Sequence, residues 1–438
     1  MLNKLLFKHI DNSPLIVFRI IFGLLCFLES VGAIFTGWIK RTLIDPEFTF
    51  NVIGFEFLQP LPGDWMYVYY FVMGLFGLGI MLGYKYRLSI IAFTAMWTAT
   101  YMMQKASYNN HYYLLILLSG IMIFQPAHRY ASIDVKQNPK LKHLSMPRWC
   151  VLLFVVQMFI VYTYASIAKI YPDWLDLTVA ENLMKAKKGY YVIGELLQHK
   201  VVHYMVAFGG ILYDGLIIPL LLFKPTRKWA FIASIFFHMF NSIVFQVGIF
   251  PYLALGFSVF FFEPRVIHKL FLKKKPFYNS GEIITPTSYK PYLTIVLVYF
   301  IVQIGLPLRH HFIQDNVLWT EEGHRLSWRM MLRSKRGTVI YKIKDKNTGE
   351  IIRVKLKDRL SRKQRSIAAT KPDIMWQFAQ RLKQEYAEKG KDVSVFVDSR
   401  ISVNGRKYSQ FTDKTIDVAA LPWETFKHTS WILPSKLD

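Results

Sequence analysis

The chain has 438 residues, of which 53% are hydrophobic and 16% aromatic, and its formal net charge is +25. A chain of this length with a positive mean hydropathy is too apolar to be fully soluble, so the composition indicates an integral membrane protein. The basic excess does not require a nucleic-acid partner. Much of it falls in short loops between apolar stretches, where membrane insertion and anionic lipid account for it.

Nine apolar stretches follow one another before the chain becomes polar. A spanning helix needs roughly 20 mostly apolar residues, and fewer where its polar ends are buried in protein. The predicted spans are residues 15–34, 66–84, 88–104, 112–126, 150–170, 201–222, 229–246, 251–263 and 291–307. We therefore expect a polytopic α-helical membrane bundle of about nine spans, formed by residues 1–307.

Basic residues in the short loops predict the orientation of this bundle. With the N-terminus in the cytoplasm, 17 Lys and Arg residues up to Lys275 fall in the inner loops, against 7 in the outer loops. Basic residues favour the cytoplasmic side of a membrane. An odd number of spans then places the C-terminal segment outside, which means the periplasm of a bacterium or the lumen of a eukaryotic secretory membrane.

Residues 308–438 predict a separate outer domain that is mixed and mostly β. Residues 338–343 and 351–356 alternate apolar and polar side chains around a turn, which is typical of a hairpin. A second hairpin is expected at Asn404-Gly405, a pair that favours the type I′ turn. Between the hairpins, residues 373–389 repeat apolar side chains at helical spacing, so one amphipathic helix is expected there.

Lys169 lies at the outer end of the fifth predicted span and has two interpretations. A lysine at a helix end commonly extends its amine to the membrane interface. If the side chain instead faces the bundle, burial among Ile167, Ala168 and Ile170 lets the neutral amine act as a base. The residue pattern alone does not choose between these alternatives.

Amides and histidines occur at the outer ends of two other spans. Asn109-Asn110-His111 begins the fourth span, where a helix N-cap among interfacial tyrosines is the simpler interpretation. His238 and Asn241 lie three residues apart on one face of the seventh span. A histidine there is more often a hydrogen-bonding partner between helices than a catalyst.

Taken together, these residues predict a site near the outer face. Lys169, the histidines and the amides should lie at one membrane depth, where apolar walls hold a ring-shaped substrate. His310 follows the ninth span, and we expect Trp328 with Met330-Met331 to close the pocket from the outer domain. The sequence has no metal-ligand spacing, phosphate loop or nucleophile elbow, so no metal is expected.

Several separated motifs occur in the order found in the vitamin K-dependent γ-glutamyl carboxylase family, and the chain resembles a bacterial-type member. The resemblance covers most of the chain and is more specific than any one motif. The matching segments are residues 61–67, Met81-Leu82-Gly83, Tyr86-Arg87, Asn109-Asn110-His111, Ala168-Lys169, Asp173-Trp174, Phe237-His238, Asn241-Ser242, Ser327-Trp328, Met330-Met331 and Thr429-Ser430-Trp431.

The resemblance implies an activity and roles for these residues. Lys169 would be the base that deprotonates a reduced naphthoquinone, either vitamin K or menaquinol. Oxygen would convert the quinol to an epoxide, and a strongly basic intermediate would remove a glutamate γ proton before carbon dioxide adds. Asn110 and His111 would orient or stabilise intermediates. The expected quinone- or substrate-binding residues are Asn109, His238, Asn241, His310, Trp328, Met330 and Met331.

Departures from the family leave other functions open. The animal enzymes join their membrane and lumenal parts by a disulfide, whereas Cys26 and Cys150 fall elsewhere. A quinol epoxidase or oxidase without peptide carboxylation is the first alternative, and a non-catalytic quinone- or lipid-binding protein is the second. The expected partners are the bilayer and a glutamate-containing peptide or protein. Such a partner suits residues 308–438, which hold 27 Lys and Arg against 15 Asp and Glu.

Overall fold

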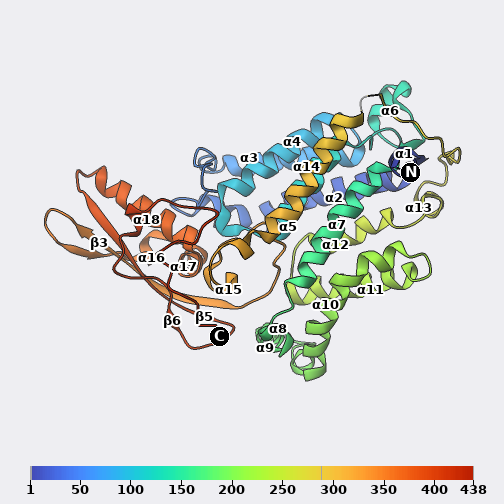
Figure 1. The fold of residues 1–438 in the computed structure, drawn as a ribbon. Coiled ribbons are helices and arrows are strands. Elements are labelled where there is room, and N and C mark those ends of the chain that lie inside the picture. Colours follow the sequence, from blue (N-terminus) through green and yellow to red (C-terminus); the bar gives the residue numbers. More distant parts are fainter. Residues whose placement is uncertain (1, 288, 438) are drawn as a thin grey trace. The chain divides into compact units, whose positions relative to one another are not determined.

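The computed structural model describes residues 2–287 and 289–437 and confirms the predicted fold class, a helical membrane bundle followed by a smaller mixed domain (Figure 1). The chain forms two compact units. The first consists of Met1–Ile44, Asn51–Thr163 and Asp214–Gln303, and the second of Asp45–Phe50, Tyr164–Tyr213 and Ile304–Asp438. The division between residues 1–307 and 308–438 stays a prediction.

Each predicted apolar stretch contains a helix. These helices are α2 (Ser13–Phe35), α3 (Trp65–Leu82), α4 (Tyr86–Met103), α5 (Asn110–Phe124), α7 (Trp149–Ile167), α10 (Lys200–Leu222), α11 (Arg227–Phe240), α12 (Phe250–Phe257) with α13 (Pro264–Phe271), and α14 (Tyr289–Leu308). Small residues bring α2 and α3 together. A Cβ at Gly77 would lie 2.7 Å from the Phe27 backbone nitrogen, so only glycine permits this close approach.

Fewer helices meet the length and composition of a membrane span than the nine that were predicted. Within the described residues, six helices are long and apolar enough to cross, and a seventh is added if the bent pair Phe250–Phe260 and Pro264–Phe271 counts as one span. The predicted spans 88–104 and 112–126 form α4 and α5, which are not among these; α5 has only 15 residues. The orientation of the bundle stays a prediction.

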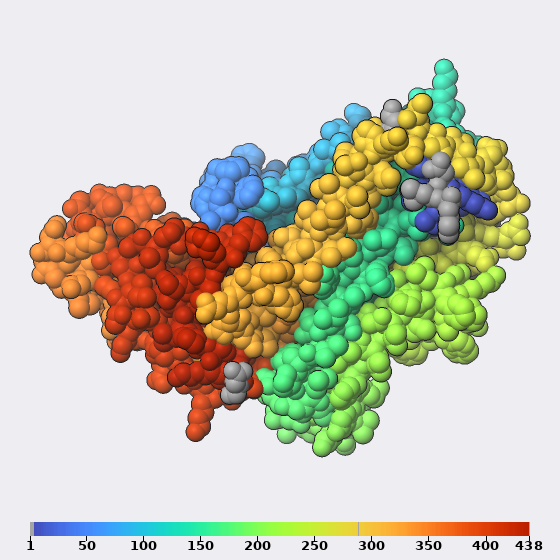
Figure 2. Space-filling model, in the orientation of Figure 1, coloured from blue at the N-terminus to red at the C-terminus, as the bar shows by residue number. Residues whose placement is uncertain are grey.

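Helix α14 illustrates how the apolar surface is distributed. Its side chains form a continuous exposed ridge in Figure 2, coloured yellow to orange. Tyr292, Ile295, Leu297 and Ile301 are each more than half exposed. A helix that is apolar and exposed along its length packs its side chains against lipid rather than against the protein interior.

A small two-stranded sheet joins two segments of the first unit that are distant in the sequence. Strand β1 (His9–Asp11) pairs antiparallel with β2 (Ser145–Pro147). The Lys275 amine lies 2.5 Å from an Asp11 carboxylate oxygen, and both side chains are fully buried. A buried charge needs such a partner, so this pair fixes the segment after α13 to the start of the chain.

The second unit contains a four-stranded antiparallel sheet of order β4-β3-β5-β6. Both predicted hairpins are confirmed. Strand β3 (Lys335–Asp345) pairs with β4 (Ile351–Arg353), and β5 (Val393–Val403) pairs with β6 (Ser409–Gln410). Asn404 and Gly405 have φ values of 52° and 85°, as a type I′ turn requires. The returning strand is shorter and later than residues 406–408, where it was expected.

The predicted amphipathic helix is confirmed as α18 (Pro372–Ala387), which packs on the sheet (Figure 1). Phe378 is fully buried, and its ring lies 4.9 Å from that of Tyr341 on β3 in an edge-to-face arrangement. Phe48 stacks on the other side of Phe378 at 5.9 Å, which explains why the short segment 45–50 belongs to this unit. The shorter helices here are α8 (Pro172–Leu175), α9 (Thr178–Lys185), α15 (Val317–Thr320), α16 (Leu356–Arg359) and α17 (Arg362–Ala368).

Candidate active site

Lys169 lies in the turn that follows α7 and is buried, with 7% of its surface exposed. Its amine donates a hydrogen bond to the Ala165 carbonyl at 3.0 Å and lies 5.7 Å from the centre of the Trp174 ring. The prediction that Ile167 and Ile170 bury this lysine is wrong, because their side chains are 55% and 60% exposed. Adjacent residues on a turn point in different directions, so burial comes from residues farther along the chain.

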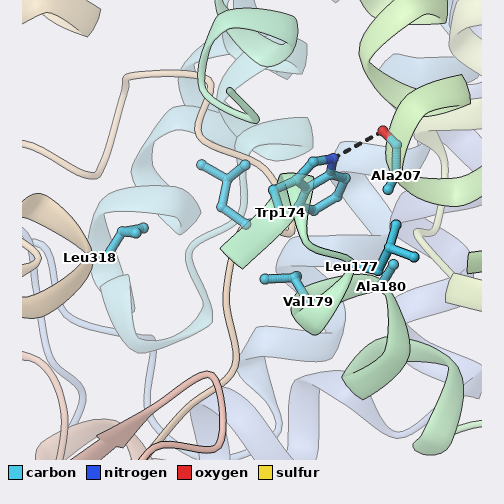
Figure 3. Packing of buried hydrophobic residues seen from close by; sticks show 7 residues of the cluster. Trp174, Leu177, Val179, Ala180, Ala207 and Leu318 are labelled. Carbon is cyan, nitrogen blue, oxygen red and sulfur yellow. Dashed lines mark hydrogen bonds between the residues drawn. The ribbon is translucent and has the colours of Figure 1, made fainter. Parts of the chain in front are cut away.

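Trp174 supplies much of that burial. Figure 3 shows its ring among apolar side chains of the second unit, with its indole nitrogen donating to the Ala207 carbonyl at 3.0 Å. Gly210, one turn farther along α10, approaches the Lys169 side chain; a Cβ there would lie 3.9 Å from the lysine Cε. The buried members of this cluster are Trp174, Leu177, Val179, Ala180, Ala207, Leu318 and Leu332.

Asp173 links the Lys169 segment to the outer sheet. Arg406 binds both of its carboxylate oxygens, and Asn404 donates to the same carboxylate at 2.7 Å. The hydrogen bonds from Arg406 hold the pKa of Asp173 below its ordinary value, and the same contact raises the pKa of Arg406. Sequence reasoning matched Asp173 to the family but missed this role. No signal in the local sequence points to Arg406, which lies more than 200 residues away in the chain.

His310 is half-buried and lies in the short helical turn, Arg309–Phe312, that follows α14. Its Nδ1 is 2.8 Å from the Pro307 carbonyl oxygen, and its Nε2 is 3.3 Å from an Arg329 guanidinium nitrogen. A Cβ at Gly323 would lie 2.7 Å from the His310 Cβ, so glycine is required there as well. His311, the alternative for this family position, is exposed.

Trp328, Met330 and Met331 belong to the same segment but differ in exposure. Trp328 is 1% exposed, Met330 is half-buried, and Met331 is 38% exposed. Trp328 and Met331 adopt positive φ values of 57° and 53°, which non-glycine residues seldom do. Such strained backbone persists where the surroundings hold it, and it is often found at functional sites. The Tyr171 hydroxyl donates to the Leu332 carbonyl and so ties this segment to the Lys169 turn.

A buried ion cluster holds the two ends of the segment that carries Trp328. The Glu321 carboxylate contacts Arg333 and Lys371, and its Oε1 lies 3.7 Å from the Lys335 amine. Burial alone would raise the pKa of Glu321, but these three cations keep it well below its ordinary value. Burial lowers the pKa of Lys371 to about 8. The cluster joins the start of α18 to the ends of the segment that carries Trp328.

His111 and His238 come together in the first unit around one phenylalanine. The His111 ring stacks on Phe250 with centroids 4.6 Å apart, and His238 meets the same ring at 5.6 Å and 75°. The Tyr162 hydroxyl lies 3.2 Å from Nε2 of His238, which is 1% exposed. His111 therefore covers one face of the Phe250 ring and His238 meets that ring at a steep angle. The contact with Tyr162 also fits the simpler interpretation of His238 as a partner between helices.

The three asparagines of the predicted site differ in their contacts. Asn109 is the N-cap of α5 and accepts a hydrogen bond from the Tyr112 backbone N–H at 2.8 Å, as the simpler interpretation predicted. Asn110 is buried, and its Oδ1 accepts from the Tyr108 hydroxyl at 2.7 Å. Asn241 is half-buried and begins a short π-helix, Asn241–Phe245, a distortion frequent at functional sites.

The predicted site residues therefore fall into two groups. Asn109, Asn110, His111, His238 and Asn241 belong to the first unit. Lys169, His310, Trp328, Met330 and Met331 belong to the second. That both groups serve one reaction stays a prediction. Within the described residues, no three His, Cys, Asp or Glu side chains gather to hold a metal ion, and the expectation of a metal-free site also stays a prediction.

Two family models match consecutive parts of the chain. The HTTM domain model matches residues 7–265, which is more than half of the sequence. The model of the lumenal domain of vitamin K-dependent gamma-carboxylase matches residues 289–438. No solved structure matches the chain.

Proposed function

Since this chain belongs to the vitamin K-dependent γ-carboxylase family, we propose that it is a membrane carboxylase with coupled vitamin K epoxidase activity. It would use oxygen to convert a reduced naphthoquinone to its epoxide and add carbon dioxide to glutamate side chains. The observation that carries this proposal is the burial of Lys169 beside Trp174, in a chain that matches the HTTM domain model and the model of the gamma-carboxylase lumenal domain.

Lys169 is the proposed base that deprotonates the quinol. Its side chain is 7% exposed, and its amine donates to the Ala165 carbonyl at 3.0 Å beside the Trp174 ring. A base must hold its amine in the neutral form, because that is the form that accepts a proton. An arginine cannot replace it, because the guanidinium stays protonated.

The first unit offers residues that fit a naphthoquinol. Its ring system is flat and apolar, with two hydroxyl groups on opposite sides of one ring, and the aromatic group of Phe250, His111 and His238 offers ring contacts and imidazole nitrogens that suit this chemistry. Asn110 and His111 would orient the oxygen atoms, and Asn109, His238 and Asn241 would hold the ring. When bound, the quinol supplies the reducing power for oxygen activation.

From the second unit, His310, Trp328, Met330 and Met331 would close the site. They lie on a segment held by the Glu321 cluster and by the Tyr171 contact with Leu332. The basic outer domain suits a glutamate-containing peptide or protein, because its excess of Lys and Arg attracts acidic chains. We propose that this domain lies in the periplasm or lumen and that the N-terminus is cytoplasmic.

Two alternatives predict different products. A quinol epoxidase or oxidase would turn over quinol without fixing carbon dioxide. A non-catalytic quinone- or lipid-binding protein would do neither, but a passive apolar pocket gains nothing from a buried lysine, since desolvating an amine costs free energy.

The test is to incubate purified protein with reduced vitamin K, oxygen, labelled bicarbonate and a glutamate-rich peptide. Label in the peptide together with epoxide supports the carboxylase. Epoxide without label favours the epoxidase, and binding of quinone with neither product favours the passive protein. A peptide in which glutamine replaces every glutamate is the control for nonspecific labelling.

A further inference from the structure

The four-stranded sheet of the second unit has one buried face and one open face. Odd-numbered residues of β3 and β5 form the buried face. There Tyr341 contacts Phe378 of α18, and its hydroxyl donates to the Ala368 carbonyl at the end of α17. Successive side chains of a strand point to opposite faces, so the even-numbered residues are turned away from both helices. The open face consists of residues 336–344 of β3 and 394–400 of β5 at even positions, with Ile351 and Arg353 of β4.

The open face is strongly basic. Its charged residues are five cations and one acid, namely Arg336, Lys342, Lys344, Arg353 and Arg400 against Asp398. The single carboxylate is already engaged, because Asp398 accepts a hydrogen bond from Gln410 of β6 at 2.9 Å. Among the residues that the structure describes, none of the five cations forms an ion pair. Lys342 is half-buried and the other four are exposed, so their charge is available to a partner.

The strand register brings three of these cations together. Lys342 of β3 lies directly opposite Arg353 of β4, which places their Cβ atoms about 5 Å apart. Lys344 is two residues farther along β3 on the same face, at about 7 Å. Like charges directly opposite one another destabilise a sheet. A carboxylate placed among these three cations removes that repulsion, so the arrangement favours an anionic partner.

The spacing of the cations fits an extended acidic chain. Carboxylates at alternate positions of an extended peptide lie about 7 Å apart on one side, as Lys342 and Lys344 do. Phe396, paired with Lys342 across the sheet, and Ile351, which is 63% exposed, offer apolar contacts to the methylene groups of glutamate. Arg400 lies four residues beyond Phe396 on β5, about 14 Å along the strand, so a segment of several residues reaches it.

We propose that the open face is a docking surface for an acidic, glutamate-rich segment of the peptide or protein substrate. The inference rests on the proposed function, because it takes that substrate as its partner. The open face holds the chain and leaves the chemistry to the candidate active site. Docking raises the effective concentration of the glutamates that react. Loss of docking should therefore raise KM for a glutamate-rich peptide and leave kcat unchanged.

The direct test measures binding without turnover. A fluorescein-labelled peptide with glutamate at alternate positions is titrated with the full-length protein in uncharged detergent, and anisotropy is recorded. Lys344→Glu and Arg400→Glu should each weaken binding about fivefold, the upper range for an exposed ion pair. Their rows on the sheet are about 20 Å apart, so the double variant should bind about 25-fold more weakly. Wild-type affinity in the double variant overturns the proposal.

Two further variants separate docking from folding and from net charge. Arg353→Glu places opposite charges across from Lys342, which stabilises the sheet, so binding should fall while Tm holds or rises. Lys389→Glu is the matched control for charge. Lys389 is exposed and follows α18, which packs on the buried face, so its replacement should leave peptide affinity unchanged. Equal weakening by Lys389→Glu overturns the proposal, because net charge alone then explains binding.

Turnover distinguishes this inference from the proposed function. If the wild type binds the peptide through the open face but fixes no carbon dioxide, the proposed function fails and the docking surface stands. Carboxylation by Lys344→Glu/Arg400→Glu with unchanged KM overturns the docking surface alone.

An anionic membrane surface is the competing occupant of the open face. A polarity-sensitive dye attached through Ser394→Cys, in a background without the native cysteines, reports on this face in nanodiscs. The peptide should shift its emission. Quenching by spin-labelled phosphatidylglycerol, with no response to the peptide, assigns the face to the membrane and overturns the proposal.

Discussion

Replacing Trp174 with alanine should destabilise the turn that carries Lys169. Trp174 is 3% exposed and packs at the centre of its apolar cluster, and truncating such a buried tryptophan costs about 3–5 kcal/mol. Loss of the hydrogen bond to Ala207 accounts for about 1 kcal/mol of this.

Thermal unfolding in detergent, followed by circular dichroism at a fixed heating rate, measures the effect. For a unit of this size, the loss corresponds to a fall in Tm on the order of 10 °C. Trp174→Phe is the matched variant, because it keeps an aromatic ring and loses the indole donor, so it should lie between wild type and alanine. An amine-reactive reagent should also modify Lys169 faster in Trp174→Ala. A Tm equal to that of wild type, with unchanged labelling, would refute the packing argument.

Three further predictions concern the outer domain. Trp328→Ala should weaken quinol turnover at least tenfold while the protein stays in the membrane, and unchanged kinetics in a folded variant count against a closing role. In a background without the native cysteines, a cysteine at Ser361 should react with an impermeant thiol reagent only from outside; labelling from the cytoplasmic side reverses the orientation. The hydrogen bond that His428 donates to the Glu322 carboxylate raises the pKa of His428, so the stabilisation from this contact is full below the ordinary histidine pKa and is lost as pH rises through the raised one. The Tm of the wild type should therefore fall as pH rises through the raised pKa, and His428→Gln should remove this fall. A wild-type Tm that rises over the same pH range contradicts the prediction.

The sequence patterns predicted those helices and turns that depend on residues close together in the chain. The helices of the bundle follow from apolar length, and the Asn404-Gly405 turn follows from two residues that accept positive φ. The strand after that turn was placed too early. Residues 406–408 were expected to pair, but Arg406 instead extends to Asp173, more than 200 residues away.

Contacts between distant segments could not be predicted in this way. Ile167 and Ile170 are apolar neighbours of Lys169, yet both side chains are exposed, and Trp174 and Gly210 cover the amine instead.

Lys169→Ala is the measurement that tests the account most directly. The purified variant is assayed with reduced vitamin K, oxygen, labelled bicarbonate and a glutamate-rich peptide, and both epoxide and fixed label are counted. We expect both products to be lost together, Lys169→Arg not to restore them, and a small added amine at raised pH to recover part of the epoxide in the alanine variant. Epoxidation by Lys169→Ala at the wild-type rate would contradict the assignment of Lys169 as the base.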